Sequence, residues 1–263
     1  MLLAIDVGNT NTVFALYQGR EPVGQWRIST NRDRTADEYA AALLQLMGLR
    51  GVGPRDVGAI LISSVVPQAV DPLRRMADLF FNRKAFVAGE DLDFPIKVQL
   101  NNPREVGADR LVNAIAAIER YEPPLIIVDF GTATTFDVVD EDKAYCGGVI
   151  APGINLSVEA LHRAAAKLPR IAVEAPEMVI GRSTVSAMQS GVYWGYIGLI
   201  EGLIDRIEAE YGSAMTVLAT GGLAALFQER CARLTHVETD LTMAGLMILY
   251  EQNRALVRGE VET

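Results

Sequence analysis

The sequence predicts an α/β protein built from two duplicated domains. The first observation is a repeated stretch: residues 5–12 (Ile-Asp-Val-Gly-Asn-Thr-Asn-Thr) return in altered form as residues 128–135 (Val-Asp-Phe-Gly-Thr-Ala-Thr-Thr). The second is a shared order of apolar segments, in which three strands precede a helix, a strand and a helix. Between the two series stands Pro123-Pro124, which is typical of a loop. We therefore expect domains at 1–121 and 122–255, followed by a frayed tail at 256–263.

Composition and charge favour a cytoplasmic protein. The chain has 263 residues, of which half are hydrophobic, and a net charge of −9. This acidic balance argues against nucleic acid or an anionic membrane as a partner, so local donors and metal ions must hold any triphosphate. Cys146 and Cys231 show no pairing or metal spacing, which predicts reduced thiols. We expect no signal peptide, since residues 1–4 lead directly into a strand, and no apolar run reaches transmembrane length.

The first half divides into β-β-β-α-β-α-β-α. Thr35 and Glu38 form a capping-box pattern, which predicts the start of a helix that ends near 48–51. The continuous apolar run 57–66 predicts a strand covered on both faces, and Pro67 predicts the start of the next helix. The expected strands are 2–5 with its returning partner, 22–28, 57–66 and 84–87, and the other helices are 67–81 and 105–120.

The second half repeats this order from residue 125. Its glycines at 191, 195, 198 and 202 fall in a long helical segment, where they favour close packing against another helix or another subunit. Intrachain packing explains their spacing equally well. The expected strands are 125–129, 134–139, 144–150 and 215–220; the expected helices run from 153 towards 167, over 183–211, from 223 and over 241–255, with a loop at 170–181.

Each copy of the repeated stretch has the pattern of a strand, a tight glycine-containing turn and a returning strand. Such a turn offers backbone N–H groups and Thr hydroxyls to an anion, while the Asp at the strand end can hold a cation. One copy alone is weak support, because ordinary turns use the same residues. Two copies predict a duplicated phosphate site. Neither contains Lys or Arg, and the chain has no P-loop, so positive charge must come from ions.

Several stretches together resemble the type III pantothenate kinases, within the superfamily of actin-like ATPases and sugar and acetate kinases. The matching stretches are 6–11 (Asp-Val-Gly-Asn-Thr-Asn), 103–110 (Pro-Arg-Glu-Val-Gly-Ala-Asp-Arg), 129–135 (Asp-Phe-Gly-Thr-Ala-Thr-Thr), 147–153 (Gly-Gly-Val-Ile-Ala-Pro-Gly) and 220–222 (Thr-Gly-Gly). The resemblance covers nearly the whole chain. It implies two actin-like (ribonuclease H-like) domains with a nucleotide cleft between them. The implied activity is ATP-dependent phosphorylation of pantothenate to 4'-phosphopantothenate, the first step towards coenzyme A.

The resemblance also implies which residues hold ATP and its ions. Asp6 would hold Mg²⁺, or another divalent ion, beside the phosphates. The alternative is that Asp6 only closes a turn. Asp129 matches the place of a monovalent cation, K⁺ or NH₄⁺, in the family. The implied ATP-binding residues are Asp6, Val7, Gly8, Asn9, Thr10, Asn11, Thr12, Val13, Thr132, Gly221 and Gly222.

Asp109 matches the family's proton acceptor. We expect the neighbouring guanidinium of Arg110 to lower the pKa of the Asp109 carboxyl, so that it stays ionised and can deprotonate an alcohol. Arg110 could bind the substrate through its forked donors. The alternative is an ordinary pair on a solvated helix face, for which replacing Asp109 would be nearly silent. The implied substrate-binding residues are Leu100, Gly107, Ala108, Asp109, Arg110 and Thr184.

Leu100 departs from the family, which often has an aromatic residue, usually Tyr, at that place. Thr184 matches a position that family members contribute from a partner subunit, so the resemblance implies a homodimer. Ser183-Thr184 also suits a helix N-cap, and the two roles are compatible. Interface candidates are 147–153 and the glycine-spaced helix.

Two rival functions are consistent with parts of the sequence. One is a non-catalytic, nucleotide-binding regulatory relative; the other is a kinase of another small alcohol, which Leu100 permits. Asp109 together with Asp6 and Asp129 favours an enzyme. His162 and His236 are isolated in the sequence, and we take both as structural or surface residues.

Overall fold

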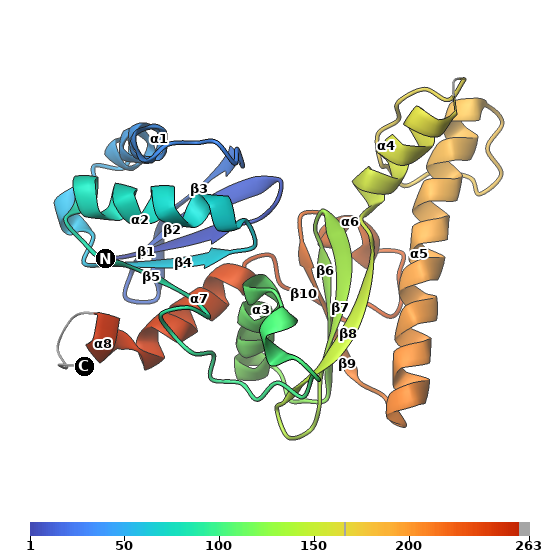
Figure 1. The fold of residues 1–263 in the computed structure, drawn as a ribbon. Coiled ribbons are helices and arrows are strands. Elements are labelled where there is room, and N and C mark those ends of the chain that lie inside the picture. Colours follow the sequence, from blue (N-terminus) through green and yellow to red (C-terminus); the bar gives the residue numbers. More distant parts are fainter. Residues whose placement is uncertain (166, 258–263) are drawn as a thin grey trace. The chain divides into compact units, whose positions relative to one another are not determined.

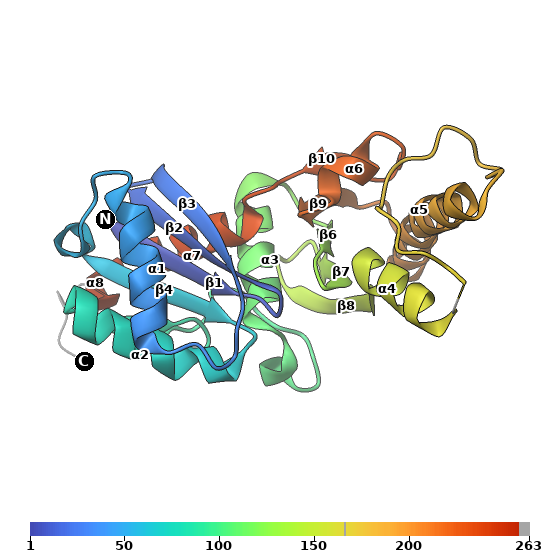
Figure 2. The same ribbon diagram turned by 90° about the horizontal axis from the view of Figure 1, so that it is seen from above.

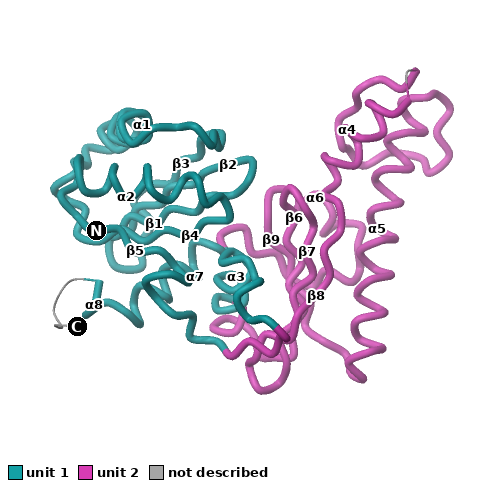
Figure 3. The backbone as a smooth tube through the Cα atoms, in the orientation of Figure 1, with its two compact units in different colours: residues 1–96, 102–116, 241–263 teal, residues 97–101, 117–240 magenta. Residues whose placement is uncertain are grey.

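The computed structural model describes residues 1–165 and 167–257 (Figure 1). The chain divides into two compact units (Figure 3). Unit 1 contains residues 1–96, 102–116 and the C-terminal segment that begins at Leu241, and unit 2 contains residues 97–101 and 117–240. Each unit is built around one five-stranded sheet.

The sheet of unit 1 has the strand order β3-β2-β1-β4-β5. β1 is antiparallel to β2 and parallel to β4, which in turn is parallel to β5. Helices α1 and α2 pack on one face, whereas α7 packs on the other (Figure 1, Figure 2). The bounds are β1 Leu2–Val7, β2 Asn11–Gln18, β3 Glu21–Ser29, α1 Ala36–Gly48, β4 Ala59–Ser64, α2 Pro67–Phe81, β5 Ala85–Val87, α3 Ala108–Arg120, α7 Leu241–Gln252 and α8 Arg254–Val257, with 3₁₀ turns at Pro54–Asp56 and Pro103–Glu105.

The sheet of unit 2 has the order β10-β9-β6-β7-β8. β6 is antiparallel to β7 and parallel to β9. The long helix α5 covers one face, where its tyrosines and isoleucines pack on Ile126, Val128 and Phe130 of β6. The bounds are β6 Leu125–Phe130, β7 Ala133–Val139, β8 Tyr145–Pro152, α4 Ile154–Ala164, α5 Thr184–Tyr211, β9 Thr216–Gly221, α6 Ala224–Gln228 and β10 His236–Val237.

The two sheets have the same topology, which confirms the predicted internal repeat. Replacing β1 to β5 by β6, β7, β8, β9 and β10 in turn converts one strand order into the other. Asp6 lies near the end of β1 and pairs in register with Ser63 of β4. Asp129 lies near the end of β6 and pairs with Thr220 of β9. The carboxyl ends of two parallel strands therefore meet at each aspartate.

Most predicted elements are confirmed, and the differences lie at their ends. The Thr35 capping box is formed, and Ser183 caps α5 in a second box with Ser186. The helix expected from residue 105 begins at Ala108, because Pro103–Glu105 forms a separate 3₁₀ turn. β4 is shorter than the run 57–66, α4 ends at Ala164, and the last helix divides into α7 and α8. The short strand β10 was not expected.

Helix α7 packs with unit 1, where Met243, Leu246 and Leu249 join the cluster on the β1 face opposite α1 and α2. The sequence division at 1–121 and 122–255 had placed this helix with the second half. Those domain boundaries stay a prediction. Of the expected tail at 256–263, the first two residues belong to α8 and the others lie outside the described residues.

Both cysteines are free thiols, as expected. Within residues 1–165 and 167–257, no helix has the combined length and hydropathy that a membrane crossing requires.

Candidate active site

The first hairpin loop, residues 8–11, is closed by backbone bonds and held by the end of β3. Gly8 N donates to Asn11 O at 3.0 Å, and Thr30 N donates to Thr10 O at 2.9 Å. The Thr30 hydroxyl also donates to Gly8 O at 2.7 Å. Asn9 and Thr10 are exposed at the tip, while Thr12 and Val13 are buried in β2. The tip can therefore offer donors to an anion without rearrangement of the hairpin.

The second hairpin loop, residues 131–133, is one residue shorter. Gly131 N donates to Ala133 O at 3.0 Å, and Gly153 N donates to Thr132 O at 3.1 Å. A Cβ atom on Gly153 would lie 2.3 Å from Thr132 O, so only glycine lets the start of α4 approach this loop so closely. The Thr132 side chain is exposed.

Gly221 leaves space beside the Asp129 carboxylate. Gly221 has φ +90°, in the left-handed region, and a Cβ atom there would lie 2.7 Å from Asp129 Oδ1 and 2.6 Å from Phe130 O. Asp129 is half-buried, whereas Gly222 is exposed with open space around its Cα. The Asp129 carboxylate oxygen and the Phe130 carbonyl oxygen are possible ligands for a cation, and glycine at 221 keeps a side chain away from both. Asp129, Thr132, Gly221 and Gly222 thus gather in unit 2.

The end of β4 connects the Asp6 loop to the start of α3. Val65 N donates to Val7 O at 3.0 Å, directly after Asp6. Val65 Cγ1 would lie 3.6 Å from a Cβ atom on Gly107, and Asp109 Oδ1 would lie 2.6 Å from the same position. Unit 1 therefore brings Asp6, Gly107 and Asp109 to one end of its sheet.

Burial raises the pKa of the Asp109 carboxyl above its ordinary value. The N–H and the charge of Arg110 act in the opposite direction but are smaller effects, although Arg110 N donates to Asp109 Oδ1 at 2.8 Å. The expectation of a lowered pKa was therefore wrong, because the carboxylate is half-buried and loses solvation. A pKa nearer neutrality makes a carboxylate a stronger base. Arg110 and Ala108 are also half-buried, on the first turn of α3.

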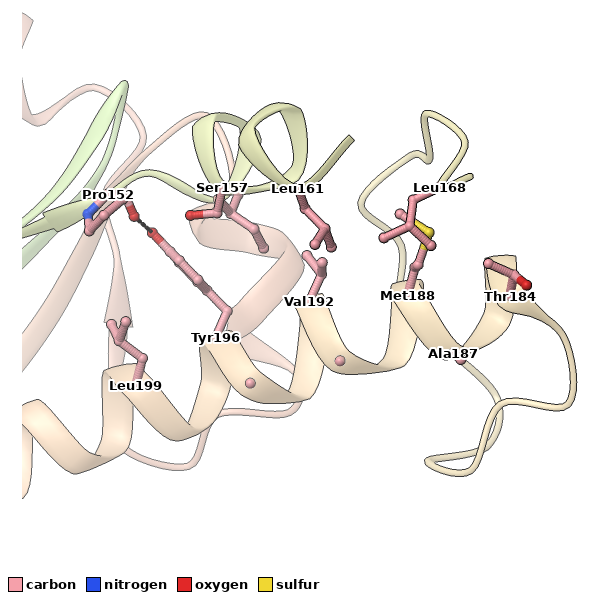
Figure 4. Close-up of a pocket in the computed structure, with 13 residues that line it drawn as sticks. Pro152, Ser157, Leu161, Leu168, Thr184, Ala187, Met188, Val192, Tyr196 and Leu199 are labelled. Atoms are coloured by element: carbon pink, nitrogen blue, oxygen red, sulfur yellow. Dashed lines mark hydrogen bonds between the residues drawn. The ribbon is translucent and has the colours of Figure 1, made fainter. Parts of the chain in front are cut away.

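Leu100 and Thr184 both lie in unit 2. Leu100 Cδ2 would lie 3.2 Å from a Cβ atom on Gly147, which has φ +122°, so Leu100 packs over β8. Thr184 is exposed on the first turn of α5. It lines a groove of about 820 Å³ between α4 and α5, together with Leu161, Met188 and Val192 (Figure 4).

Thr184 lies far from the second hairpin loop of its own chain. The Tyr196 hydroxyl contacts the Thr134 hydroxyl and donates to Pro152 O at 3.1 Å, which fixes this part of α5 at the loop (Figure 4). Thr184 precedes Tyr196 by 12 residues (196 minus 184) on one helix, a separation of about 18 Å. The structure therefore does not bring Thr184 to Thr132 within one chain.

Sequence reasoning missed two buried polar residues beside the aspartates. Asp137 has no exposed surface and accepts hydrogen bonds from Tyr145 OH at 2.7 Å and Thr135 Oγ1 at 3.1 Å. Thr135 pairs with Asp129 across the hairpin, so Asp137 holds a direct neighbour of Asp129. Ser63 is also fully buried and pairs with Asp6. Their signal in the sequence was a polar residue at an inward position of a strand.

The two histidines have separate local contacts. His162 Nδ1 contacts Leu168 O, and the His236 ring packs on the Tyr121 ring.

The duplicated sheets and the paired aspartate hairpins define the actin-like ATPase and sugar-kinase fold. Solved structures agree in fold. An activator of 2-hydroxyisocaproyl-CoA dehydratase from Clostridium difficile, with bound ADPNP, has a TM-score of 0.56 at 12% identity, over 100% of this chain and 98% of its own. A ROK hexokinase from Thermus thermophilus has a TM-score of 0.51 at 13% identity, over 95% and 99%.

The chain belongs to the type III pantothenate kinase family, whose model matches residues 2–206. The type III pantothenate kinase of Rhodospirillum rubrum is 56% identical over 255 residues, which cover 97% of this chain and 99% of the relative. That of Caulobacter vibrioides is 54% identical over 255 residues, which cover 96% and 98%.

We predict that Gly221→Ala weakens nucleotide binding at least tenfold, whereas Gly222→Ala leaves it within about twofold. The first change inserts a Cβ atom against Asp129 and Phe130 at a positive φ, and the second enters open space. Isothermal titration calorimetry of each purified variant with ADP, in buffer that contains Mg²⁺ and K⁺, measures the dissociation constant. Equal affinities for both variants would contradict a binding role for the Asp129 and Gly221 corner.

Proposed function

We propose that this protein transfers the γ-phosphoryl group of ATP to the primary hydroxyl of pantothenate, giving 4'-phosphopantothenate for coenzyme A synthesis in the cytoplasm. The observation that carries this proposal is the convergence of Asp109 and the Asp6 hairpin at one end of unit 1, in a chain of this kinase family. Phosphoryl transfer depends mainly on positioning and on neutralisation of charge, together with an acceptor for the hydroxyl proton.

Asp109 serves as the proton acceptor in this proposal. Its carboxylate accepts the hydroxyl proton while the alcohol oxygen bonds to the γ-phosphorus and the bond to the β-phosphate oxygen breaks, releasing ADP. Loss of solvation supports this role, since it raises the pKa of the Asp109 carboxyl. Arg110, Gly107 and Ala108 lie on the same turn and would position the pantothenate, with Leu100 from the segment over β8.

Each hairpin would supply donors to the ATP phosphates. Residues 6–13 would form the first ATP-binding segment, in which Thr12 and Val13 are buried behind the exposed tip. Thr132 would act from the second loop, with Gly221 and Gly222 on the adenosine side. The Asp6 carboxylate would hold Mg²⁺ or another divalent ion, which supplies charge neutralisation at the phosphates. Asp129 would hold K⁺ or NH₄⁺. The neighbouring donor set and the space left by Gly221 support this assignment.

We also propose a homodimer in which the partner subunit supplies Thr184 to the pantothenate site. Two observations support it. Thr184 is about 18 Å along α5 from the part fixed at its own second loop, and the groove beside it is lined mostly by apolar side chains, among them the exposed Leu161. Further exposed apolar side chains on β8, α4 and α5 are Ile150, Leu156 and Val185. Apolar surface of this kind favours burial against another protein surface. The glycines at 191 and 195 line the groove and leave room for close approach.

We predict that Asp109→Asn lowers kcat for pantothenate phosphorylation at least about hundredfold, because the amide cannot accept the proton. A coupled ADP-release assay with pantothenate, and with a panel of polyols, measures this. An Asp109→Asn variant that keeps more than about a tenth of the wild-type rate would exclude Asp109 as the base. Wild-type activity on a polyol alone would instead identify a kinase of another alcohol.

The pH dependence provides a control on the same variant. Because the pKa of the Asp109 carboxyl is raised, the folded state retains a proton at pH values where the unfolded state has lost it. The free energy of unfolding therefore falls as the pH rises through this window, which lies above pH 3.8. Asp109→Asn removes this dependence, and we expect its unfolding midpoint at neutral pH to equal or exceed the wild-type midpoint. In the wild-type protein, kcat/KM should fall at low pH as the Asp109 carboxylate is protonated, and the midpoint of this fall should lie above pH 3.8.

We predict that exchanging K⁺ for Na⁺ lowers the rate at least tenfold, because the smaller, more strongly hydrated ion fits the Asp129 corner less well. Steady-state rates at constant ionic strength in KCl, NH₄Cl and NaCl measure this. Choline chloride gives the rate without a binding cation. Equal rates in all four salts would remove the monovalent cation from the proposal.

We predict that mixing Asp109→Asn with Thr184→Ala restores activity that neither variant has alone. In a mixed dimer, one site combines an intact Asp109 from one subunit with an intact Thr184 from the other. Leu161→Asp, which places a charge in the groove, should give monomers by analytical ultracentrifugation, whereas Leu49→Asp on an exposed position of unit 1 should not. Failure of the mixture to recover activity after subunit exchange would place Thr184 in its own chain's site.

A further inference from the structure

Ser63 carries a buried hydroxyl without a hydrogen-bond partner. Its side chain has no exposed surface, and among residues 1–165 and 167–257 no group donates to or accepts from Ser63 Oγ. Such an atom is unfavourable, because it loses its bonds to water on folding and gains none in return. A buried polar atom of this kind calls for an explanation in function or in another state of the site.

The position of Ser63 suggests that explanation. Ser63 and Asp6 are paired in the parallel register of β4 and β1, two neighbouring strands about 4.8 Å apart. Alternation along each strand places both side chains on the same face, the one that Leu2, Ala4, Ala59 and Leu61 share. The hydroxyl therefore lies next to the carboxylate that would hold the divalent ion.

The neighbouring serine behaves differently. Ser64 Oγ donates to Val66 O at 3.0 Å and accepts from Val66 N at 3.1 Å, where the chain turns into α2. Its hydroxyl has a local structural role. Ser63 has none in the described chain, although the two residues are adjacent on one strand.

The second sheet has a hydroxyl residue at the same place. Thr220 of β9 pairs with Asp129 of β6 in the same register in which Ser63 pairs with Asp6, and Thr220 is only 3% exposed. Both aspartates therefore have a buried hydroxyl residue on the neighbouring parallel strand. An apolar residue would fill either position without the cost of burying a hydroxyl.

We propose that Ser63 is a positioning residue of the Asp6 metal site, which rests on the proposed function. When a divalent ion is held with the nucleotide, Ser63 Oγ–H donates to the Asp6 carboxylate oxygen that faces β4, and this bond fixes the carboxylate orientation. A hydrogen bond that forms only in the metal-loaded state contributes to metal-nucleotide affinity and not to the stability of the free protein. Ser63 touches neither the reacting atoms nor the substrate in this role.

The test compares Ser63→Ala with Ser64→Ala in the full chain. We expect Ser63→Ala to bind ADP in Mg²⁺ about tenfold more weakly, while its affinity for ADP in EDTA and its urea midpoint stay equal to or above wild type. Ser64→Ala should show the reverse, with a lower urea midpoint and unchanged affinity for ADP in Mg²⁺. Titration calorimetry gives the affinities, and Mn²⁺ electron paramagnetic resonance with ADP gives ion binding directly.

Three results would overturn the inference. The first is an unchanged affinity of Ser63→Ala for ADP in Mg²⁺. The second is a loss of ADP affinity that is equal with and without the ion. The third is a fall in the urea midpoint that matches that of Ser64→Ala. The proposed function fails separately, if the wild-type protein binds ADP in Mg²⁺ but does not phosphorylate pantothenate. In that case the comparison of the two serines still decides the role of Ser63.

Discussion

The parallel pairing of the first strand of each half with the fourth strand of that half determines the rest of the structure. In this pairing the carboxyl ends of β1 and β4, and of β6 and β9, lie side by side, and each pair ends at an aspartate. The hairpin that follows each aspartate must turn at that edge, so its tip and the carboxylate are placed together. One arrangement, used twice, gives two candidate anion-binding loops, neither of which contains a lysine or arginine.

The repeat also explains why so much of the fold could be predicted. The strands repeat in one order in both halves, so each half supports the interpretation of the other. Ends of elements were less predictable, since Pro103 produces a separate turn before α3 and no periodicity signals where β4 stops. Helix α7 follows the second half in the sequence, yet its apolar residues pack on β1 and β4 of unit 1, a long-range contact that no local pattern signals.

The candidate site was predictable where chemistry is visible in a motif, and not where it depends on burial. The hairpin residues and Asp109 follow from the repeat and from family resemblance. The pKa of Asp109 does not, because Arg110 beside it in the sequence suggests a lowering, whereas loss of solvation is the larger effect. An inward polar residue on a strand was the only sequence signal for Ser63 and Asp137, and it does not show their partners. In the folded sheets Ser63 pairs with Asp6, and Asp137 accepts a hydrogen bond from Thr135, which pairs with Asp129.

The proposed roles place different demands on the three carboxylates, all of which are half-buried. As the proposed base, Asp109 would benefit from burial, since a higher proton affinity lets a carboxylate accept a proton from an alcohol. Asp6 and Asp129 would hold cations in the proposed roles, and both lie half-buried near strand ends, where they pair with Ser63 of β4 and Thr220 of β9. In unit 1, one end of the sheet thus combines Asp6, the proposed ion ligand near the end of β1, with Asp109, the proposed proton acceptor at the start of α3. A hydroxyl such as that of Ser63 suits the first task, because it can stabilise a carboxylate without adding charge that would compete with the metal ion.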